Sequence, residues 1–114
     1  MGRSSQFSYK LLVGYSYPNK YAKDFSQTKI KNTTFKKCIF KNMSMVNTTF
    51  KDCIFKECKF IKCDLSGTVF EYSEITDCEF KACKTRITFL RCYNTKNMKL
   101  PKYTNYKILD RGNC

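Results

Sequence analysis

Eight cysteines in a chain of 114 residues are the first side chains here that could carry chemistry. So many cysteines in a short chain are typical of a disulfide framework or a metal site. The stretches CIFKEC (53–58) and CKFIKC (58–63) superficially resemble the spacing of metal ligands. The chain contains no histidine, however, and a zinc site is therefore not expected. We predict neither a bound metal nor a cofactor.

Catalytic groups are equally scarce in this sequence. Without histidine, no ordinary side chain is suited to proton transfer at neutral pH. The sequence also lacks a glycine-rich phosphate loop and a pair of acids in an apolar setting. We therefore predict no catalytic residue, no enzymatic activity and no small-molecule substrate.

Large apolar residues recur at every fifth position from residue 25 to residue 90, with one exception in fourteen positions. An α-helix turns through about 500° in five residues, which spreads such positions around the cylinder. A continuous strand places successive fifth residues on opposite faces. These side chains share an interior only if the chain turns a corner once per repeat. The positions are Phe25, Ile30, Phe35, Phe40, Met45, Phe50, Phe55, Phe60, Leu65, Phe70, Ile75, Phe80, Thr85 and Leu90.

The other positions of each repeat separate an inside from an outside. Two residues before each large apolar residue the side chain is small and weakly polar, and only Lys23 and Met43 break this rule. Between Phe25 and Ala82 all ten lysines and all seven acids fall on the remaining three positions. This is the binary pattern of a buried core with a charged surface.

This pattern resembles that of the pentapeptide-repeat proteins, whose units read small residue, polar residue, Leu or Phe, then two polar residues. The resemblance implies an all-β fold, a right-handed quadrilateral β-helix solenoid with one repeat per side and about twenty residues per coil. We expect the pentapeptide-repeat β-helix at residues 25–90, in about three to four coils spaced by about 4.8 Å. Residues 1–24 and 91–114 are then the N-terminal and C-terminal caps.

Residues twenty apart lie over one another in such a fold, so Phe40, Phe60 and Phe80 are expected to form one column. Six of the cysteines occupy the small inward position, where a free thiol behaves as a small buried hydrophobe. Stacked cysteines are close enough for a disulfide, but their parallel side chains suit its torsion angle poorly. We therefore expect reduced thiols there. Cys92 and Cys114 fall outside the register and are the best candidates for a disulfide.

The formal net charge of +13 is high for this length. The first 62 residues carry thirteen basic and three acidic side chains, and the other 52 carry nine and six. Stacking would place Lys31 under Lys51 and Lys36 under Lys56, which is an unfavourable basic ladder. An acidic partner such as nucleic acid or heparan sulfate would relieve this repulsion. Alternatively, the lysines serve only solubility and the protection of sheet edges.

Three glycosylation sequons begin at Asn32, Asn42 and Asn47, each two residues after a core position. Glycans there would indicate an extracellular or vesicle-luminal location, as part of a membrane protein. Otherwise a cytoplasmic location is expected. No run approaches the roughly 20 apolar residues that span a bilayer, and the N-terminus lacks a signal-peptide core.

Four stretches also look like the large luminal loop of the synaptic vesicle glycoprotein 2 family: KIKNTTFKKCIFKN, VNTTFKDCIF, GTVFEYSE and CEFKACK. In that family the loop joins two membrane helices, carries N-glycans and is bound by botulinum neurotoxins at an open strand edge. Carried over by position, the resemblance implies a protein partner that pairs with an edge strand. The strand here is Lys84, Thr85, Arg86, Ile87, Thr88, Phe89, Leu90 and Arg91.

Three functions are compatible with these features, in decreasing order of preference. The first is a non-catalytic protein-recognition domain that binds its partner through the β-edge, with glycans contributing. The second is a basic solenoid that binds anionic polymers. The third is a gyrase-directed pentapeptide protein, which is least favoured because such proteins mimic DNA with an acidic surface. The thin ends of the solenoid are compatible with a monomer or an end-stacked dimer.

Overall fold

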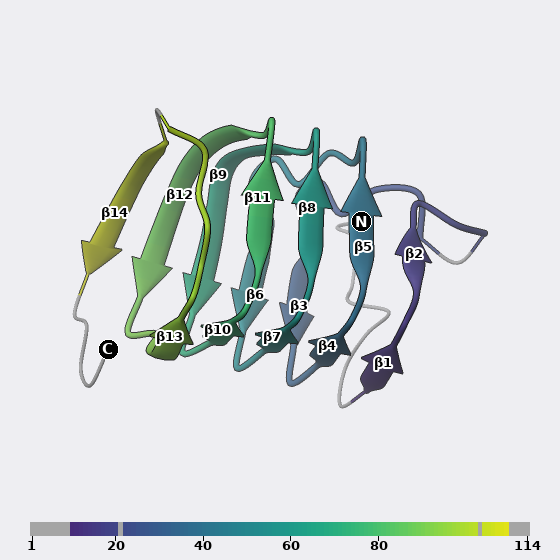
Figure 1. The fold of residues 1–114 in the computed structure, drawn as a ribbon, viewed down its shortest axis with the longest axis horizontal. Helices are drawn as coiled ribbons and strands as arrows, with labels where there is room; N and C mark the ends of the chain where they lie inside the picture. Colours follow the sequence, from purple (N-terminus) through teal and green to yellow (C-terminus); the bar gives the residue numbers. More distant parts are fainter. Residues whose placement is uncertain (1–9, 21, 103, 110–114) are drawn as a thin grey trace.

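A computed structural model describes residues 10–20, 22–102 and 104–109 of the chain. The fourteen elements in these ranges are all β-strands. None of the described residues belongs to a helix long and apolar enough to span a membrane. The strands form three sheets, and within each sheet the strands are parallel and follow one another along the long axis of the molecule (Figure 1).

Each sheet forms one side of the molecule. The first contains, in spatial order, β14 (Asn105–Leu109), β12 (Lys84–Leu90), β9 (Asp64–Glu71), β6 (Thr49–Lys51) and β3 (Lys29–Lys31). The second contains β1 (Leu11–Val13), β4 (Thr34–Lys36), β7 (Ile54–Lys56), β10 (Glu74–Thr76) and β13 (Tyr93–Lys96). The third contains β11 (Glu79–Lys81), β8 (Lys59–Ile61), β5 (Ile39–Lys41) and β2 (Ser16–Tyr17).

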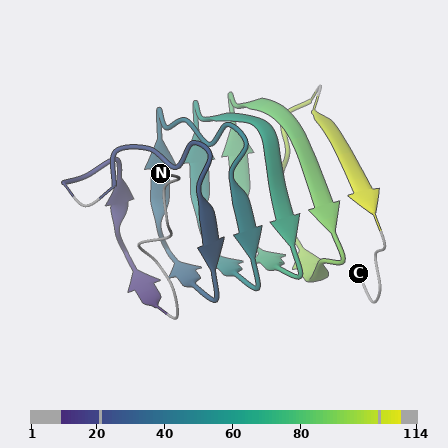
Figure 2. The ribbon, with the colours of Figure 1, turned by 180° about the vertical axis from the view of Figure 1, so that it is seen from behind.

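Consecutive strands belong to different sheets, so the chain visits each side once per coil. The fourth side is closed by a bridge between Ser44 and Asp64 and by main-chain hydrogen bonds, such as the 2.7 Å bond from Met45 N to Asp64 O. The chain winds right-handedly, as Figure 1 and the view from behind in Figure 2 show. The predicted four-sided β-helix is therefore confirmed.

Residues with left-handed backbone form the corners. They lie two positions after the inward apolar residue, and their φ angles are close to +55°. This conformation costs roughly 1–2 kcal/mol for a residue with a Cβ, and Asn and Asp tolerate it best. Gly67 takes one corner, where an added Cβ would lie 2.2 Å from Asn47 Oδ1. Corners within the repeat are Gln27, Asn32, Lys37, Asn42, Asn47, Asp52, Glu57, Lys62, Tyr72, Asp77 and Ala82.

The core consists of columns of stacked phenylalanine rings. Phe40, Phe60 and Phe80 form the predicted column, with ring centroids 4.7 and 4.4 Å apart. Phe35 and Phe55 stack at 4.9 Å in a neighbouring column. Between the columns the rings meet edge to face, as Phe35 and Phe40 do at 5.4 Å. These aromatic contacts add to the burial of apolar area.

The small inward residues make the same kind of hydrogen bond, which explains why cysteine, threonine and serine interchange there. From Cys38 onward, the hydroxyls and thiols at this position donate to a main-chain carbonyl of the preceding coil. Cys58 Sγ lies 3.2 Å from Phe35 O, and Ser73 Oγ lies 3.2 Å from Phe50 O. The seven cysteines among the described residues are free thiols.

Strand β9 contains Gly67, and β12 has no residue opposite it. The register between the two strands therefore shifts by one residue after Arg86. Only 1% of Ile87 and 3% of Phe89 is exposed, so these two residues face the core. The prediction that Thr88 and Leu90 occupy the inward positions was therefore wrong. An uninterrupted count of five cannot detect a residue missing at a corner.

The β-helix also extends beyond the boundaries predicted at 25–90. In the segment predicted as the N-terminal cap, β1 and β2 pair in parallel with β4 and β5. In the segment predicted as the C-terminal cap, β13 and β14 pair in parallel with β10 and β12. Two of the sheets consequently have five strands, and the molecule measures 34 × 28 × 27 Å.

Candidate functional site at the C-terminal end

The last strand of the β-helix, β14, lies at the edge of its sheet. It pairs in parallel with β12, from Asn105 opposite Arg86 to Leu109 opposite Leu90. No strand in the described part of the chain pairs with its other side, and it forms the left end of the molecule in Figure 1. An edge strand presents unpaired N–H and C=O groups, which are a template for another chain.

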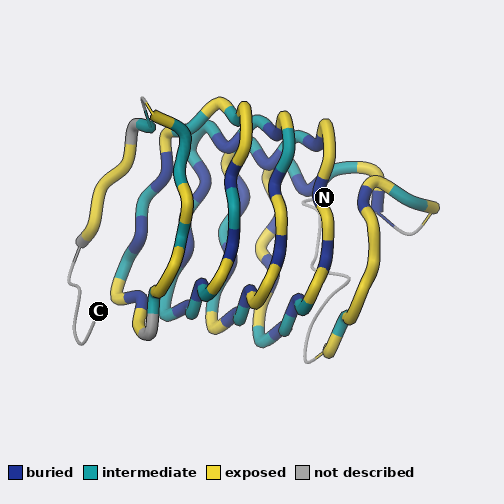
Figure 3. Tube along the Cα trace, viewed as in Figure 1, coloured by how far each residue is buried: buried dark blue, intermediate teal, exposed yellow. Residues whose placement is uncertain are grey.

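Two apolar side chains accompany this edge. Tyr106 and Ile108 align with Ile87 and Phe89, which face the core. The ring of Tyr106 lies 6.1 Å from that of Phe89, in a T-shaped contact. Nevertheless 50% of Tyr106 and 43% of Ile108 is exposed, and Figure 3 shows this end of the molecule largely in the exposed colour. Inward-facing apolar residues without a cover favour the docking of another chain.

The edge predicted at residues 84–91 is not open. Here β12 is paired on one side with β9, and from Arg86 to Leu90 it is paired on the other side with β14. The prediction of an open edge was wrong because β14 carries no five-residue repeat. The alternation of Tyr106 and Ile108 in the stretch NYKIL is the strand signal that could have revealed β14. A contact of this segment with a partner stays a prediction.

Cationic side chains surround the C-terminal end. One of them, Lys84, contributes to a lowered pKa of Asp64. The largest cause of that lowered pKa is the hydroxyl of Ser66, which donates a 2.6 Å hydrogen bond to Asp64 Oδ1. The exposed basic residues at this end, here called the basic rim, are Lys84, Arg86, Arg91 and Lys107.

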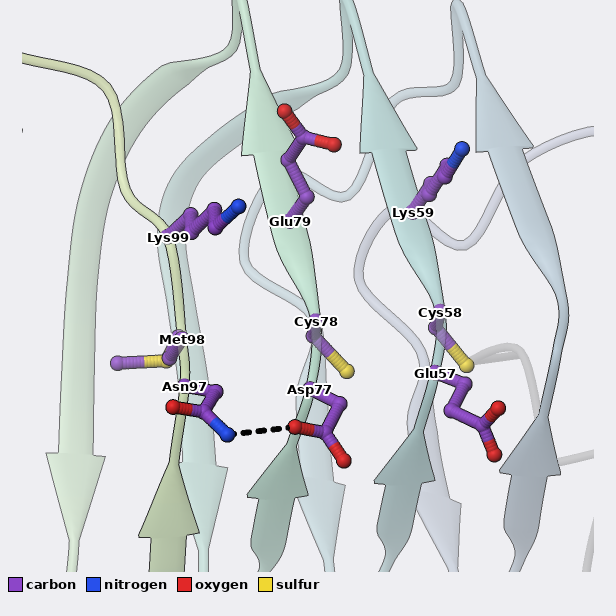
Figure 4. Close-up of a pocket in the computed structure, with 9 residues that line it drawn as sticks. All are labelled: Glu57, Cys58, Lys59, Asp77, Cys78, Glu79, Asn97, Met98 and Lys99. Carbon is purple, nitrogen blue, oxygen red and sulfur yellow. Dashed lines mark hydrogen bonds between the residues drawn. The ribbon is translucent and has the colours of Figure 1, made fainter.

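A polar groove of about 670 Å³ crosses the last three coils beside β8 and β11 (Figure 4). Along it Asn97 Nδ2 donates a 2.8 Å hydrogen bond to Asp77 Oδ1. Glu79 lies between Lys59 and Lys99 in the strand register. These alternating charges offset one another, so the groove offers no strong field for a charged ligand. The two thiols in its lining, Cys58 and Cys78, donate to main-chain carbonyls, at 3.2 Å to Phe35 O and 3.4 Å to Phe55 O.

The predicted stacking of lysines on the outer walls is confirmed. Lys31 lies opposite Lys51, and Lys36 lies opposite Lys56. The first pair is followed by Glu71, which lies opposite Lys51 in the next coil. Binding of an acidic partner to these walls stays a prediction.

The three sequon asparagines lie at corners of the β-helix. Asn32, Asn42 and Asn47 all have positive φ. Asn42 and Asn47 are exposed, whereas Asn32 is half-buried. The corners thus present these side chains near the surface, and glycosylation stays a prediction.

Cys92 is not outside the register, contrary to the prediction. It is buried, and its Sγ lies 3.2 Å from Phe70 O, in the hydrogen bond typical of the inward cysteines. The missing residue in β12 shifts Cys92 into the inward position. Cys114 lies outside the described residues, and a disulfide between the two stays a prediction.

The sequence matches one family of known proteins. A family model described as the pentapeptide repeat region matches residues 33–104, whereas no curated protein matches the sequence. Two trypsin-treated forms of QnrB1, a plasmid-mediated fluoroquinolone resistance protein, are similar at TM-scores of 0.47 and 0.44 and identities of 22% and 21%. These matches cover 86% and 82% of this chain, but only 55% of each QnrB1 chain.

A pentapeptide repeat protein from the cyanobacterium Cyanothece 51142 is also similar, at a TM-score of 0.25 and 9% identity over 88% of both chains. The chain described here therefore spans about half the length of the two QnrB1 chains.

Proposed function

The chain belongs to the pentapeptide repeat family, and from that premise we propose that it is a non-catalytic recognition domain that binds an extended segment of a partner protein at its C-terminal end. One observation supports the proposal above the others. The edge strand β14 has a free side among the described residues, and its inward-facing Tyr106 and Ile108 are about half exposed.

The binding mode is β-strand addition. A partner strand beside β14 would satisfy the unpaired main-chain groups of that edge and continue the parallel sheet. An apolar side chain of the partner would cover Tyr106 and Ile108, removing their exposed area from water at about 25 cal/mol per Å². The stacked rings of Phe70 and Phe89, 5.5 Å apart, give this added layer a rigid base.

The basic rim indicates the composition of the partner segment. Lys84, Arg86 and Lys107 are exposed around β14. A strand that alternates apolar with acidic residues matches both the apolar centre and the positive rim. Rim charges of this kind mainly raise the association rate, so binding should weaken with increasing salt without being lost.

A peptide library displayed on phage tests this proposal. We expect selection on the purified domain to yield apolar and acidic peptides that compete with one another. Peptide binding should slow hydrogen–deuterium exchange in residues 105–109. The substitution Ile108→Ser should lower affinity at least about tenfold, which is about 1.4 kcal/mol.

A matched substitution at the opposite end is the control. Val13 is a branched aliphatic residue of similar exposure, 50% against 43% for Ile108. Val13→Ser should therefore leave affinity unchanged. Equal losses in both variants, or exchange protection outside the C-terminal end, would contradict the proposal.

We extend the proposal to the luminal loop of the synaptic vesicle glycoprotein 2 family. The four similar stretches and the recognition end at the C-terminal rim support this extension. It places the domain outside the cell or in a vesicle lumen, with glycans on Asn32, Asn42 or Asn47. Mass spectrometry of natively produced protein should detect at least one of these glycans, and the receptor-binding domain of a botulinum neurotoxin should bind. Unmodified asparagines together with no toxin binding would remove this extension only.

The stacked lysines support a second candidate, the binding of nucleic acid or heparan sulfate. Lys31, Lys51, Lys36 and Lys56 form two in-register pairs on neighbouring walls. Such binding predicts a steep fall in affinity between about 50 and 200 mM salt. Lys36→Gln combined with Lys56→Gln should weaken heparin retention. Retention that is unaffected by these changes would reject this candidate.

A gyrase-directed activity remains the least favoured function because the chain carries a net charge of +13. A DNA mimic requires an acidic surface, and a strongly basic domain does not supply one. We expect no inhibition of gyrase in a supercoiling assay. Inhibition at stoichiometric concentration would reverse this ranking.

A further inference from the structure

Cys83 differs from the other described cysteines in being half-buried rather than buried. It lies in the inward position one coil after Cys63, and the two coils are joined there by a 3.0 Å hydrogen bond from Lys84 N to Cys63 O. The thiols of Cys63 and Cys83 donate to Phe40 O and Phe60 O, at 3.2 Å in both cases. Equivalent bonds in successive coils make the two side chains parallel neighbours.

A surface groove of about 370 Å³ lies beside Cys63. Its lining includes Cys63, the thioether-bearing Met43, the cationic side chains of Lys62 and Lys84, and the acidic side chain of Asp64. Met43 occupies the same inward position one coil earlier, as the 2.9 Å hydrogen bond from Asp64 N to Met43 O shows. Three sulfur-bearing side chains therefore follow one another in a column beside a groove.

Stacked thiols of this kind suit a bound ion better than a disulfide. A disulfide needs sulfurs about 2.05 Å apart and converging Cβ atoms. Side chains in register on neighbouring strands instead run parallel at about 4.7–4.9 Å. Two metal–thiolate bonds of about 2.3 Å each nearly span that separation. We propose that Cys63 and Cys83 bind one copper(I) ion between their sulfur atoms, with the Met43 thioether as a neighbouring soft donor.

The donor set selects the ion. Soft thiolate and thioether ligands favour copper(I) among the biological metals. A structural zinc site requires four ligands, and in the described residues no group of three or more His, Cys, Asp or Glu side chains is arranged to hold a metal. The prediction of no metal made from the sequence considered only zinc-like spacing. Stacked cysteines were weighed there only as a disulfide and not as metal ligands.

Coordination exchanges two S–H bonds for two S–Cu bonds, releases two protons and transfers no electron. The complex carries one negative charge, and the groove beside it is lined by two cations, Lys62 and Lys84, and one acid, Asp64. The two cysteines bind as thiolates, so copper(I) displaces the protons that they donate to Phe40 O and Phe60 O.

Anaerobic titration of the reduced protein with copper(I), against a chromophoric copper(I) chelator, tests this site. A Cys114→Ser background removes the one cysteine outside the described residues. We expect one tightly bound equivalent. Cys63→Ser and Cys83→Ser should each lower the affinity by about 100-fold. Bound copper(I) should also protect Cys83 from iodoacetamide.

Cys53→Ser is the matched control. Cys53 occupies the same kind of inward position, but its neighbours in the adjacent coils are Thr33 and Ser73. Removing its thiol breaks no thiol pair, so copper(I) affinity should not change. Ser73 also shows that the inward position accommodates serine, and a melting curve of each metal-free variant verifies folding.

Two results would overturn the proposal. The first is unchanged affinity in folded Cys83→Ser. The second is a loss of binding in Cys58→Ser while Cys83→Ser still binds, because the ion would then belong to the column of Cys38, Cys58 and Cys78. If Cys63→Ser does not fold, Cys63→Thr replaces it, since threonine fills the same position at Thr48 and Thr68.

Discussion

At the N-terminal end of the β-helix the inward-facing residues are covered, whereas at the C-terminal end they are not. Tyr17, Ala22 and Phe25 are nearly fully buried at the first end. Tyr106 and Ile108 at the other end occupy equivalent inward positions and are about half exposed. Both ends are terminal coils of one solenoid, so the difference lies in whether a neighbouring segment of the chain covers the outermost inward residues.

The connection between β2 and β3 provides the cover at the N-terminal end. Asn19 and Ala22 exchange two main-chain hydrogen bonds, which fold this segment into a turn. The ring of Tyr17 stacks 5.3 Å from Phe40 and lies 5.9 Å from Phe25. At the C-terminal end the described chain ends with β14, and nothing in the described residues lies beyond it.

Exposure alone does not distinguish the two ends. Leu11 and Val13 on β1 are exposed, at 67% and 50%. They point away from the core, because Leu12 between them packs against it. A solenoid thus tolerates outward apolar residues at a sealed end, whereas uncovered inward residues mark an end that can accept another strand.

The largest expected effect distinguishes a buried core residue from a half-buried neighbour near the C-terminal end. Phe89→Ala should destabilise the domain by about 3–5 kcal/mol, because Phe89 is buried and stacks on Phe70. Leu90→Ala should cost less than about 1 kcal/mol, since Leu90 is only half-buried. Urea denaturation of both variants measures the difference. A larger loss of stability in Leu90→Ala than in Phe89→Ala would contradict the shifted register and support an uninterrupted five-residue repeat.

The second prediction compares the terminal tyrosines. Tyr17→Ala should cost about 3 kcal/mol, because it removes a buried ring from the column of Phe40. Tyr106→Ala should cost less than about 1 kcal/mol, since half of that side chain is already in water. Denaturation curves with equal slopes would validate the comparison. Equal costs would mean that the two ends are closed to the same degree.

Alkaline pH should weaken the sealed end selectively. Burial raises the pKa of Tyr17 to about 12, with smaller contributions from Cys38 and Tyr15. The folded state therefore holds this proton more tightly than the unfolded chain, where the pKa is about 10. This contribution to stability is complete below pH 10 and is lost as the pH rises through 12. Tyr17→Phe should show a smaller fall in unfolding free energy between pH 9 and 12, and an unchanged fall would contradict this assignment.

The central coils were predictable from the sequence because every repeat except the one that begins at Met43 obeys one local rule. The inward residue must be large, the residue two before it must be small and able to donate a hydrogen bond, and the residue two after it must tolerate positive φ. Phe40, Phe60 and Phe80 satisfy the first condition in three successive coils, and their stacking followed directly. No long-range information was required.

The terminal coils were not predictable in this way. The residue missing opposite Gly67 moves the inward positions to Ile87, Phe89 and Cys92, which a fixed count assigns to the outside. Beyond that point the sequence has no five-residue repeat, and β14 is held in place by its backbone pairing with β12. Main-chain hydrogen bonds do not depend on side-chain identity, so the five-residue period could not indicate the real edge.

The smallest effect concerns charge, which also differs along the molecule. Lys56 lies opposite Lys36 and the neutral Thr76, so Lys56→Glu changes a like-charge pair into an opposite-charge pair. Stability should rise by about 0.5 kcal/mol at low salt and by less in 0.5 M salt. Lys51→Glu is the control, because Lys51 lies between Lys31 and Glu71. The change removes the repulsion from Lys31 but creates a repulsion with Glu71, so stability should not change. If both variants gain equally, the net positive charge of the N-terminal coils, rather than the stacked pair, destabilises them.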